Sequence, residues 1–173
     1  MALRKIMTEQ DAPLNKVCRP ITNFDERLHI LLDDMLETLV DSDGVGLAAP
    51  QVGVLRRAVI VAEGDNYIEM LNPEITFQEG LQDGLEGCLS VPDVWGLVER
   101  PDHVKVKALD RDGNEFELEA WDLTARACCH EIDHLDGHLF TEKVHKYLSG
   151  QELEEYFQAQ LDAQEAEAEE GNE

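Results

Sequence analysis

The sequence predicts an α+β domain in which mixed sheets wrap around one central helix, followed by a C-terminal helix. Three observations support this class. Apolar residues recur at helical spacing near the start of the chain, and a second helical segment carries the sequence HEIDH at residues 130–134. Apolar and polar residues alternate in several short runs, as in half-buried strands. The sequence of 173 residues has no internal repeat or long linker, and its length is typical of a single domain.

The first helix is expected over residues 25–41. Its apolar residues are three or four positions apart and therefore share one face, which consists of Leu28, Leu31, Leu32, Met35 and Leu39. We expect this helix to pack beside the central helix.

Strands are expected over residues 57–62 and 69–76. Two further runs, 103–109 and 115–120, alternate on either side of a turn at 110–114 that is rich in aspartate, glycine and asparagine. These two runs predict a β-hairpin.

The central helix is expected to begin at Asp122, which can act as an N-cap, and to end at Gly137, which can adopt the left-handed conformation. Leu123, Ala127 and Leu135 are its candidate buried residues. Its histidines should therefore lie partly inside the domain.

His130 and His134 are four positions apart, so they project from one face of a helix and can bind one metal ion. Glu131, next to the first histidine, can lean toward the open position of that metal and take a proton from bound water. The pattern is typical of metal-assisted hydrolysis.

The third metal ligand has two kinds of candidate. One class of zinc peptidases uses a downstream glutamate, and the available residues are Glu152, Glu154 and Glu155. These glutamates fit better as the solvent-exposed face of an amphipathic C-terminal helix. The other candidate is Cys88, in a glycine-containing turn at 86–92. The remaining cysteines, Cys18, Cys128 and Cys129, are expected to be ordinary buried thiols, without disulfide framework or CxxC pair.

Residues 44–53 form a tract of small residues, GVGLAAPQVG, with the amide side chain of Gln51 near its end. Small residues allow the backbone to approach a ligand closely. The tract lacks the Gly-Lys-Ser/Thr ending and the GxGxxG pattern, so nucleotide phosphate is a poor fit.

Together, GVGLAAPQ (44–51), EGCLS (86–90) and HEIDH (130–134) closely resemble the motifs of the peptide deformylase family, in the family's order. The resemblance covers roughly the first 145 residues. It implies removal of the N-formyl group from the initiator methionine of nascent polypeptides, with release of formate.

The resemblance also implies roles for individual residues. Cys88, His130 and His134 would bind the metal, and Glu131 would be the general acid/base. Gln51 and the Leu89 backbone N–H would form the oxyanion hole. Val45 and Gly46 would pair with the substrate backbone, and Val45, Leu123 and Ala127 are candidates for the methionine pocket.

The implied metal is Fe²⁺, with Zn²⁺ or Ni²⁺ as substitutes. Glu86 and Arg100 would form a pair that steadies the cysteine loop, and the role of Arg126 stays open.

Two rival functions remain. A zinc endopeptidase would use HEIDH with a downstream glutamate. A non-catalytic module would close its metal site with a fourth ligand, Cys128 or Cys129. Glu131 and Gln51 argue against the second rival, because a structural site needs neither a base nor an oxyanion donor.

The net charge is −24, from 14 basic and 38 acidic residues, which argues against binding to nucleic acid or anionic lipid. No apolar stretch approaches the roughly 18 residues of a membrane span, and no signal-peptide core follows the start. We expect a cytoplasmic protein.

We divide the chain into a catalytic domain at 1–149 and an acidic helix and tail at 150–173. The first half of the acidic segment should be a docked helix and its last ten residues a frayed tail. Some relatives dock on the ribosome through a basic C-terminal helix. A transient ribosome association is therefore one implied partnership, although the acidic tail argues against the same contact.

Overall fold

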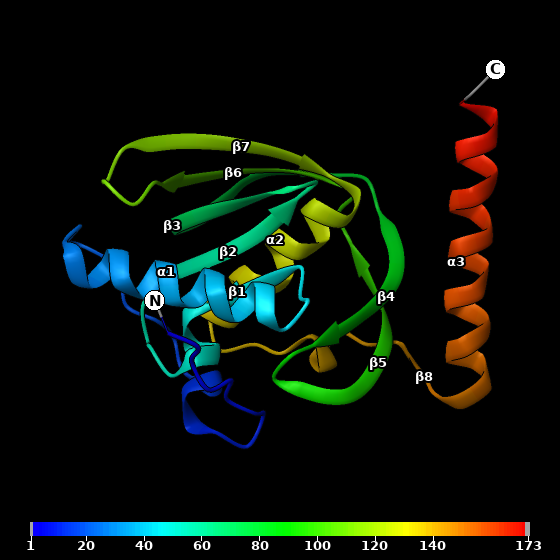
Figure 1. Cartoon of the computed structure of the whole chain (residues 1–173), viewed down its shortest axis with the longest axis horizontal. Helices are drawn as coiled ribbons and strands as arrows, with labels where there is room; N and C mark the ends of the chain where they lie inside the picture. Colours follow the sequence, from blue (N-terminus) through cyan, green and yellow to red (C-terminus); the bar gives the residue numbers. More distant parts are fainter. Residues whose placement is uncertain (1, 172–173) are drawn as a thin grey trace.

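The computed structural model describes residues 2–171 and consists of two sheets and three α-helices (Figure 1). The α-helices are α1 (Glu26–Asp41), α2 (Asp122–Leu135) and α3 (Gly150–Glu170). The strands are β1 (Gly46–Ala48), β2 (Ala58–Glu63), β3 (Asn66–Glu79), β4 (Gln82–Cys88), β5 (Val91–Arg100), β6 (His103–Leu109), β7 (Glu115–Trp121) and β8 (Lys146–Leu148). Short 3-10 turns lie at Ala12–Asn15, Ala49–Val52 and Phe140–Glu142.

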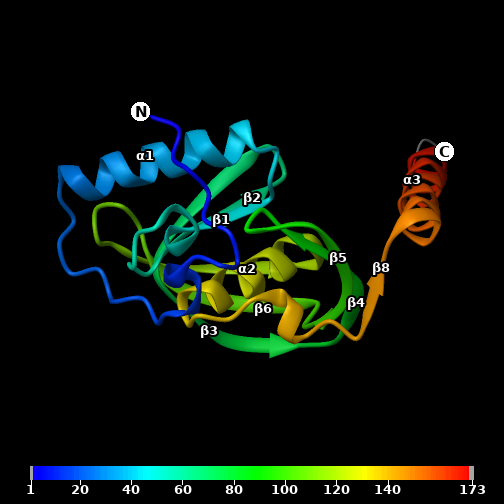
Figure 2. The ribbon, with the colours of Figure 1, turned by 90° about the horizontal axis from the view of Figure 1, so that it is seen from below.

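The larger sheet has the order β1-β2-β3-β6-β7, and its neighbouring strands pair antiparallel. It curves around α2, which lies between β1 and β2 on one side and β3 and β6 on the other (Figure 2). The predicted class and the central position of the HEIDH helix are therefore confirmed. The predicted hairpin is also confirmed, as β6 and β7.

Helix α1 lies on the opposite face of this sheet from α2 (Figure 2). Side chains of β2 alternate between the two faces: Val59 and Val61 pack in the core around α2, whereas Ala58 and Ile60 pack against α1. The prediction that the first helix packs beside the central helix is therefore wrong, because β1 and β2 separate them.

The smaller sheet has the order β4-β5-β8, with β4 at one edge. We predicted only a rigid turn around Cys88. The structure instead places Cys88 at the end of β4, where it pairs with Val91 at the start of β5 after a register shift. The cysteine is thus fixed by a tight hairpin.

Helix α2 differs from the prediction at its start. The N-cap is Trp121, and no side chain caps the helix; Asp122 is instead its first residue, with φ of +50°. The predicted end is confirmed: Gly137 has φ of +79°, and a Cβ there would lie 2.9 Å from the carbonyl carbon of Asn15. Only glycine fits this position without strain.

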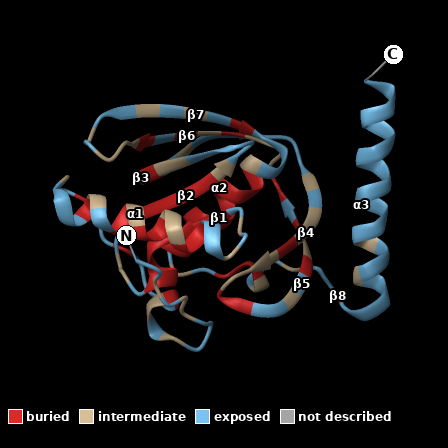
Figure 3. Ribbon diagram, viewed as in Figure 1, coloured by how far each residue is buried: buried red, intermediate tan, exposed pale blue. Residues whose placement is uncertain are grey.

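Helix α3 stands at one side of the molecule and is exposed along most of its length (Figure 3). It continues to Glu170, so the frayed tail predicted for the last ten residues is wrong as far as Glu170; residues 172–173 lie outside the described part. Alanine, glutamate and glutamine are good helix formers, which accounts for the longer helix. None of the helices within residues 2–171 is long and apolar enough to cross a membrane.

Candidate active site

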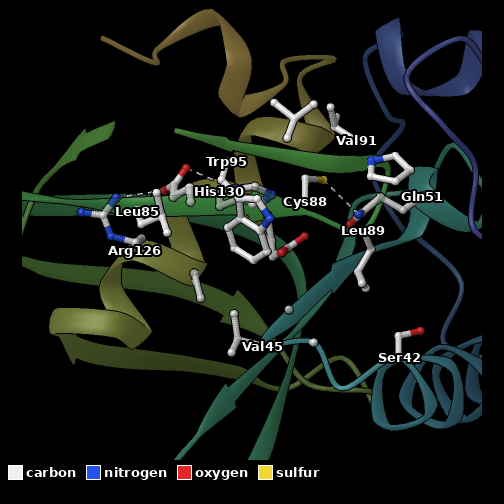
Figure 4. Close-up of a pocket in the computed structure, with 18 of the residues that line it drawn as sticks. Ser42, Val45, Gln51, Leu85, Cys88, Leu89, Val91, Trp95, Arg126 and His130 are labelled. Atoms are coloured by element: carbon white, nitrogen blue, oxygen red, sulfur yellow. Dashed lines mark hydrogen bonds and ion pairs between the residues drawn. The ribbon is translucent and has the colours of Figure 1, made fainter. Parts of the chain in front are cut away.

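A pocket with a volume of about 530 Å³ opens between the loop before β1, the β4–β5 hairpin and α2 (Figure 4). Nine of the ten residues that we predicted for the site line this pocket: Val45, Gly46, Gln51, Cys88, Leu89, Leu123, Ala127, His130 and Glu131. The tenth, His134, lies behind them and is almost completely buried. Three separate sequence motifs therefore meet at one place.

Cys88, His130 and His134 form the one group in residues 2–171 whose side chains could jointly hold a metal ion. Their potential ligand atoms all lie within 4.8 Å of one another, and Cys88 Sγ is 3.3 Å from His134 Nε2. The thiol comes from the end of β4, and the two imidazoles come from one face of α2.

Glu86 fixes the orientation of His130, because its Oε2 lies 3.3 Å from His130 Nδ1. This contact leaves Nε2 of His130 for the metal group. Arg100 in turn donates to both oxygens of Glu86, at 2.9 and 3.1 Å, so the predicted Glu86–Arg100 pair is present. Burial alone would raise the pKa of Glu86, but its hydrogen bonds with His130 and Arg100 outweigh burial and hold the pKa at about 2.

The imidazoles are in different electrostatic environments. Burial, followed by the nearby His130, lowers the pKa of His134 to about 3, so His134 is neutral at ordinary pH and has a free lone pair. For His130, burial opposes the charge, but hydrogen bonds with Cys88 and Glu86 raise its pKa above the ordinary value.

Glu131 is buried, and its carboxyl group lies against the backbone of Gly46: a Cβ at that glycine would be 2.5 Å from Glu131 Oε1. Desolvation raises the pKa of Glu131 to about 7. Its Oε2 atom has no hydrogen-bond partner among the described residues. A buried, unpartnered carboxyl oxygen beside a histidine pair is unusual unless a ligand completes the site.

Gln51 is held in one orientation. Its Oε1 accepts from the Ala48 backbone N–H at 2.8 Å, and its Nε2 donates to Ser90 Oγ at 3.2 Å and lies 3.6 Å from Cys88 Sγ. The amide NH₂ therefore points toward the cysteine. Our sequence analysis gave no role to Ser90, although it belongs to the EGCLS motif, which was the available signal.

The residues present fit a bound metal ion. Nε2 of His134 lies 3.3 Å from Cys88 Sγ, and Oε2 of Glu131 is buried without a partner among the described residues. A thiolate with two imidazoles is a donor set for a divalent transition metal such as zinc or iron, and it leaves a coordination position open.

The predicted methionine pocket is more exposed than expected, since Val45 and Leu123 lie at its mouth and only Ala127 is buried. Leu85 and Trp95 also line the pocket and were missed, because strands β4 and β5 were not predicted. Arg126 also lines the pocket, and its guanidinium donates to Val98 O at 2.8 Å, Gln82 O at 3.2 Å and Glu86 Oε1 at 3.3 Å.

The rival ligands do not join this group. Burial raises the pKa of Cys128 to about 12 and that of Cys129 to about 11, and neither belongs to the metal group. Glu152, Glu154 and Glu155 lie exposed on α3, also outside that group.

The fold and a Cys-His-His group that could hold a metal ion indicate the class of metal-dependent hydrolases, and comparisons with known proteins identify the family. Residues 3–149 match the family model described as polypeptide deformylase. A peptide deformylase from Caldicellulosiruptor bescii is 58% identical over 155 residues, which are 90% of this chain and 93% of the relative.

Solved structures agree. A peptide deformylase from Thermotoga maritima superposes with a TM-score of 0.82 at 36% identity, covering 84% of this chain and 100% of that one. A class I type b peptide deformylase from Acinetobacter baumannii, solved with Met-Ala-Ser bound, gives a TM-score of 0.80 at 36% identity over 83% of this chain and 99% of that one.

The chain belongs to the polypeptide deformylase family. Its reaction is the hydrolytic removal of the N-formyl group from the initiator methionine of new polypeptides, with release of formate, as the family resemblance implied.

Proposed function

We propose that Cys88, His130 and His134 hold one Fe²⁺ ion in this deformylase and that Glu131 is its general acid/base. The observation that carries the proposal is the meeting of three ligand atoms within 4.8 Å beside the unpartnered carboxyl oxygen of Glu131. The donor types suit iron or zinc, and the choice of Fe²⁺ rests on the family resemblance, with Zn²⁺ or Ni²⁺ as substitutes.

The chemistry needs a nucleophile at neutral pH, which a bound divalent ion supplies by lowering the pKa of water toward about 7. Glu131 would take the proton from the attacking water and pass it to the amine that leaves when the formamide C–N bond breaks. Its buried position keeps bulk water from competing for that proton.

Gln51 and the Leu89 backbone N–H stabilise the negative oxygen that develops on the formyl group. The Ala48 N–H fixes the Gln51 amide so that its NH₂ faces the site rather than its carbonyl. Loss of one such donor costs about 3 kcal/mol of barrier stabilisation.

The peptide lies along β1 as an added strand, because β1 is an edge of the larger sheet. The Val45 carbonyl already accepts a hydrogen bond from Ala62 N at 2.8 Å. Since backbone groups alternate in direction along a strand, Gly46 presents its groups to the open edge. The Met-Ala-Ser peptide bound by the A. baumannii relative is what deformylation of a formylated peptide leaves, which supports the same substrate class.

We place this activity in the cytoplasm, on nascent chains. From residue 150 on, the chain has no lysine or arginine. Helix α3 therefore cannot attract ribosomal RNA by positive charge, and any transient contact with the ribosome would use another surface.

The metal assignment is tested with protein purified without oxygen and reconstituted separately with Fe²⁺, Zn²⁺ and Ni²⁺. We expect one bound ion per chain for each metal and the highest kcat/KM for formate release with Fe²⁺. Higher activity with Zn²⁺ would contradict the iron assignment.

A further inference from the structure

Helix α3 contacts strands β4 and β5 through two neighbouring aromatic residues. The Leu85 backbone N–H donates to the Tyr156 hydroxyl at 3.2 Å, and the Phe157 ring meets the Trp95 ring edge-on, with centroids 5.6 Å apart and planes at 86°. Both contacts come from the first eight residues of the helix, whereas its later turns are exposed.

The two residues that α3 contacts line the substrate pocket. Leu85 is on β4 and Trp95 is on β5, and Figure 4 shows both side chains at the pocket beside His130. The Trp95 ring also covers Gly87, where a Cβ would lie 2.7 Å from its Cζ3 atom. A line of contacts therefore runs from Phe157 through Trp95 to the residue that precedes Cys88.

Strand β4 is an edge strand, so the outward N–H groups of its backbone lack a strand partner on that side. The Tyr156 hydroxyl accepts a hydrogen bond from one of these groups, the Leu85 N–H. Leu85 and Trp95 are thus contacted by residues beyond position 149, where the match to the family model ends.

We propose that Tyr156 and Phe157 are positioning residues for the substrate, which hold Leu85 and Trp95 as one apolar wall of the pocket. Trp95 is 36% exposed and lies at the pocket mouth, so its ring needs the Phe157 edge to stay ordered before the peptide binds. The inference rests on the proposed function, because it assigns this wall to the peptide substrate of the same site.

The test uses full-length, iron-loaded protein and formyl-Met-Ala-Ser as the peptide. Because an edge-to-face pair contributes about 0.5–1.5 kcal/mol, we expect Phe157→Ala to raise KM for formate release by roughly two- to tenfold, with kcat within twofold of wild type. Leu161→Ala is the matched control, since Leu161 is an exposed apolar residue on the next turn of the same helix.

A double-mutant cycle with Trp95→Ala identifies the route. Phe157→Ala should have no further effect on KM once Trp95 is removed, because the helix acts through that ring. Equal KM for Phe157→Ala and Leu161→Ala, or full additivity with Trp95→Ala, would overturn the inference. If Phe157→Ala does not fold, Tyr156→Phe is used with hydrogen exchange, and the Leu85 amide should lose protection while peptide KM rises.

Failure of the proposed function is distinguishable from failure of this inference. In a Trp121→Phe background, Trp95 is the one remaining tryptophan, and its fluorescence reports peptide binding without turnover. Binding that weakens in Phe157→Ala supports the inference even if no formate is released. Binding that is unchanged in Phe157→Ala contradicts the inference, whereas binding that is absent in the parent protein contradicts the proposed substrate class on which the inference rests.

Discussion

Arg100 donates two hydrogen bonds to Glu86, from Nε to Oε1 at 2.9 Å and from Nη2 to Oε2 at 3.1 Å, and both side chains are buried. The same carboxylate orients His130. One buried ion pair therefore connects the folding of the smaller sheet to the geometry of the metal group on α2.

Breaking this pair should affect both stability and metal affinity. Arg100→Leu leaves a buried carboxylate short of its main partner, so we expect the free energy of unfolding to fall by about 3–5 kcal/mol and metal affinity to fall about 10- to 100-fold. Urea titration and metal competition measure the two quantities. Lys146→Ala, which breaks the exposed Lys146–Glu152 pair, is the control, with a loss under about 1 kcal/mol. Similar losses in both variants would argue against the role of the buried pair.

Gly46→Ala should impair catalysis more than folding. The added Cβ would lie 2.5 Å from Glu131 Oε1, so the carboxyl group must move by about 1 Å, a displacement that can reduce kcat roughly 100-fold. Gly171→Ala is the control, because the nearest atom to its added Cβ is 3.5 Å away. A Gly46→Ala enzyme with wild-type kcat would show that the Glu131 position is not critical.

Cys88→Ser should strip the metal, whereas Glu155→Gln should leave it in place. The reason is that Cys88 belongs to the buried group of three ligands, and Glu155 is exposed on α3. Metal content per chain after dialysis measures the difference. Retention by Cys88→Ser together with loss in Glu155→Gln would favour the downstream glutamate as ligand.

Stability should fall in alkaline solution because of buried thiols. Burial raises the pKa of Cys18 from 9.0 to about 11, so the unfolded chain releases this proton first as pH rises. A raised folded-state pKa gives stability that is complete below pH 9 and is lost as pH rises through 11. Within that window this thiol should lower the free energy of unfolding by about 1.4 kcal/mol per pH unit. The decrease in the free energy of unfolding per pH unit, measured by urea titration at several pH values, should be smaller by that amount in Cys18→Ala. An unchanged slope would refute the assignment to Cys18.

The candidate site could be predicted because its determinants are local. Two histidines four positions apart on a helix share a face regardless of the surrounding fold, and the motif around Cys88 contains its own tight turn. That these motifs meet in space came from the family resemblance, not from spacing.

The missed features depend on contacts between distant segments. The apolar stripe of α1 showed which face is buried, but not that a sheet separates it from α2. Strand β4 has glycines at 84 and 87 and acids at 83 and 86, which hide its alternation, so Leu85 and Trp95 were not recognised as pocket residues. The contact of Phe157 with Trp95 likewise joins residues 62 positions apart.

The most direct test of the account is formate release from formyl-Met-Ala-Ser by anaerobically prepared, iron-loaded protein, measured beside its Glu131→Gln variant. We predict rapid release by the wild type and a collapse of kcat in the variant with its metal still bound. No formate from the fully metallated wild type, or an undiminished rate in Glu131→Gln, would contradict the account.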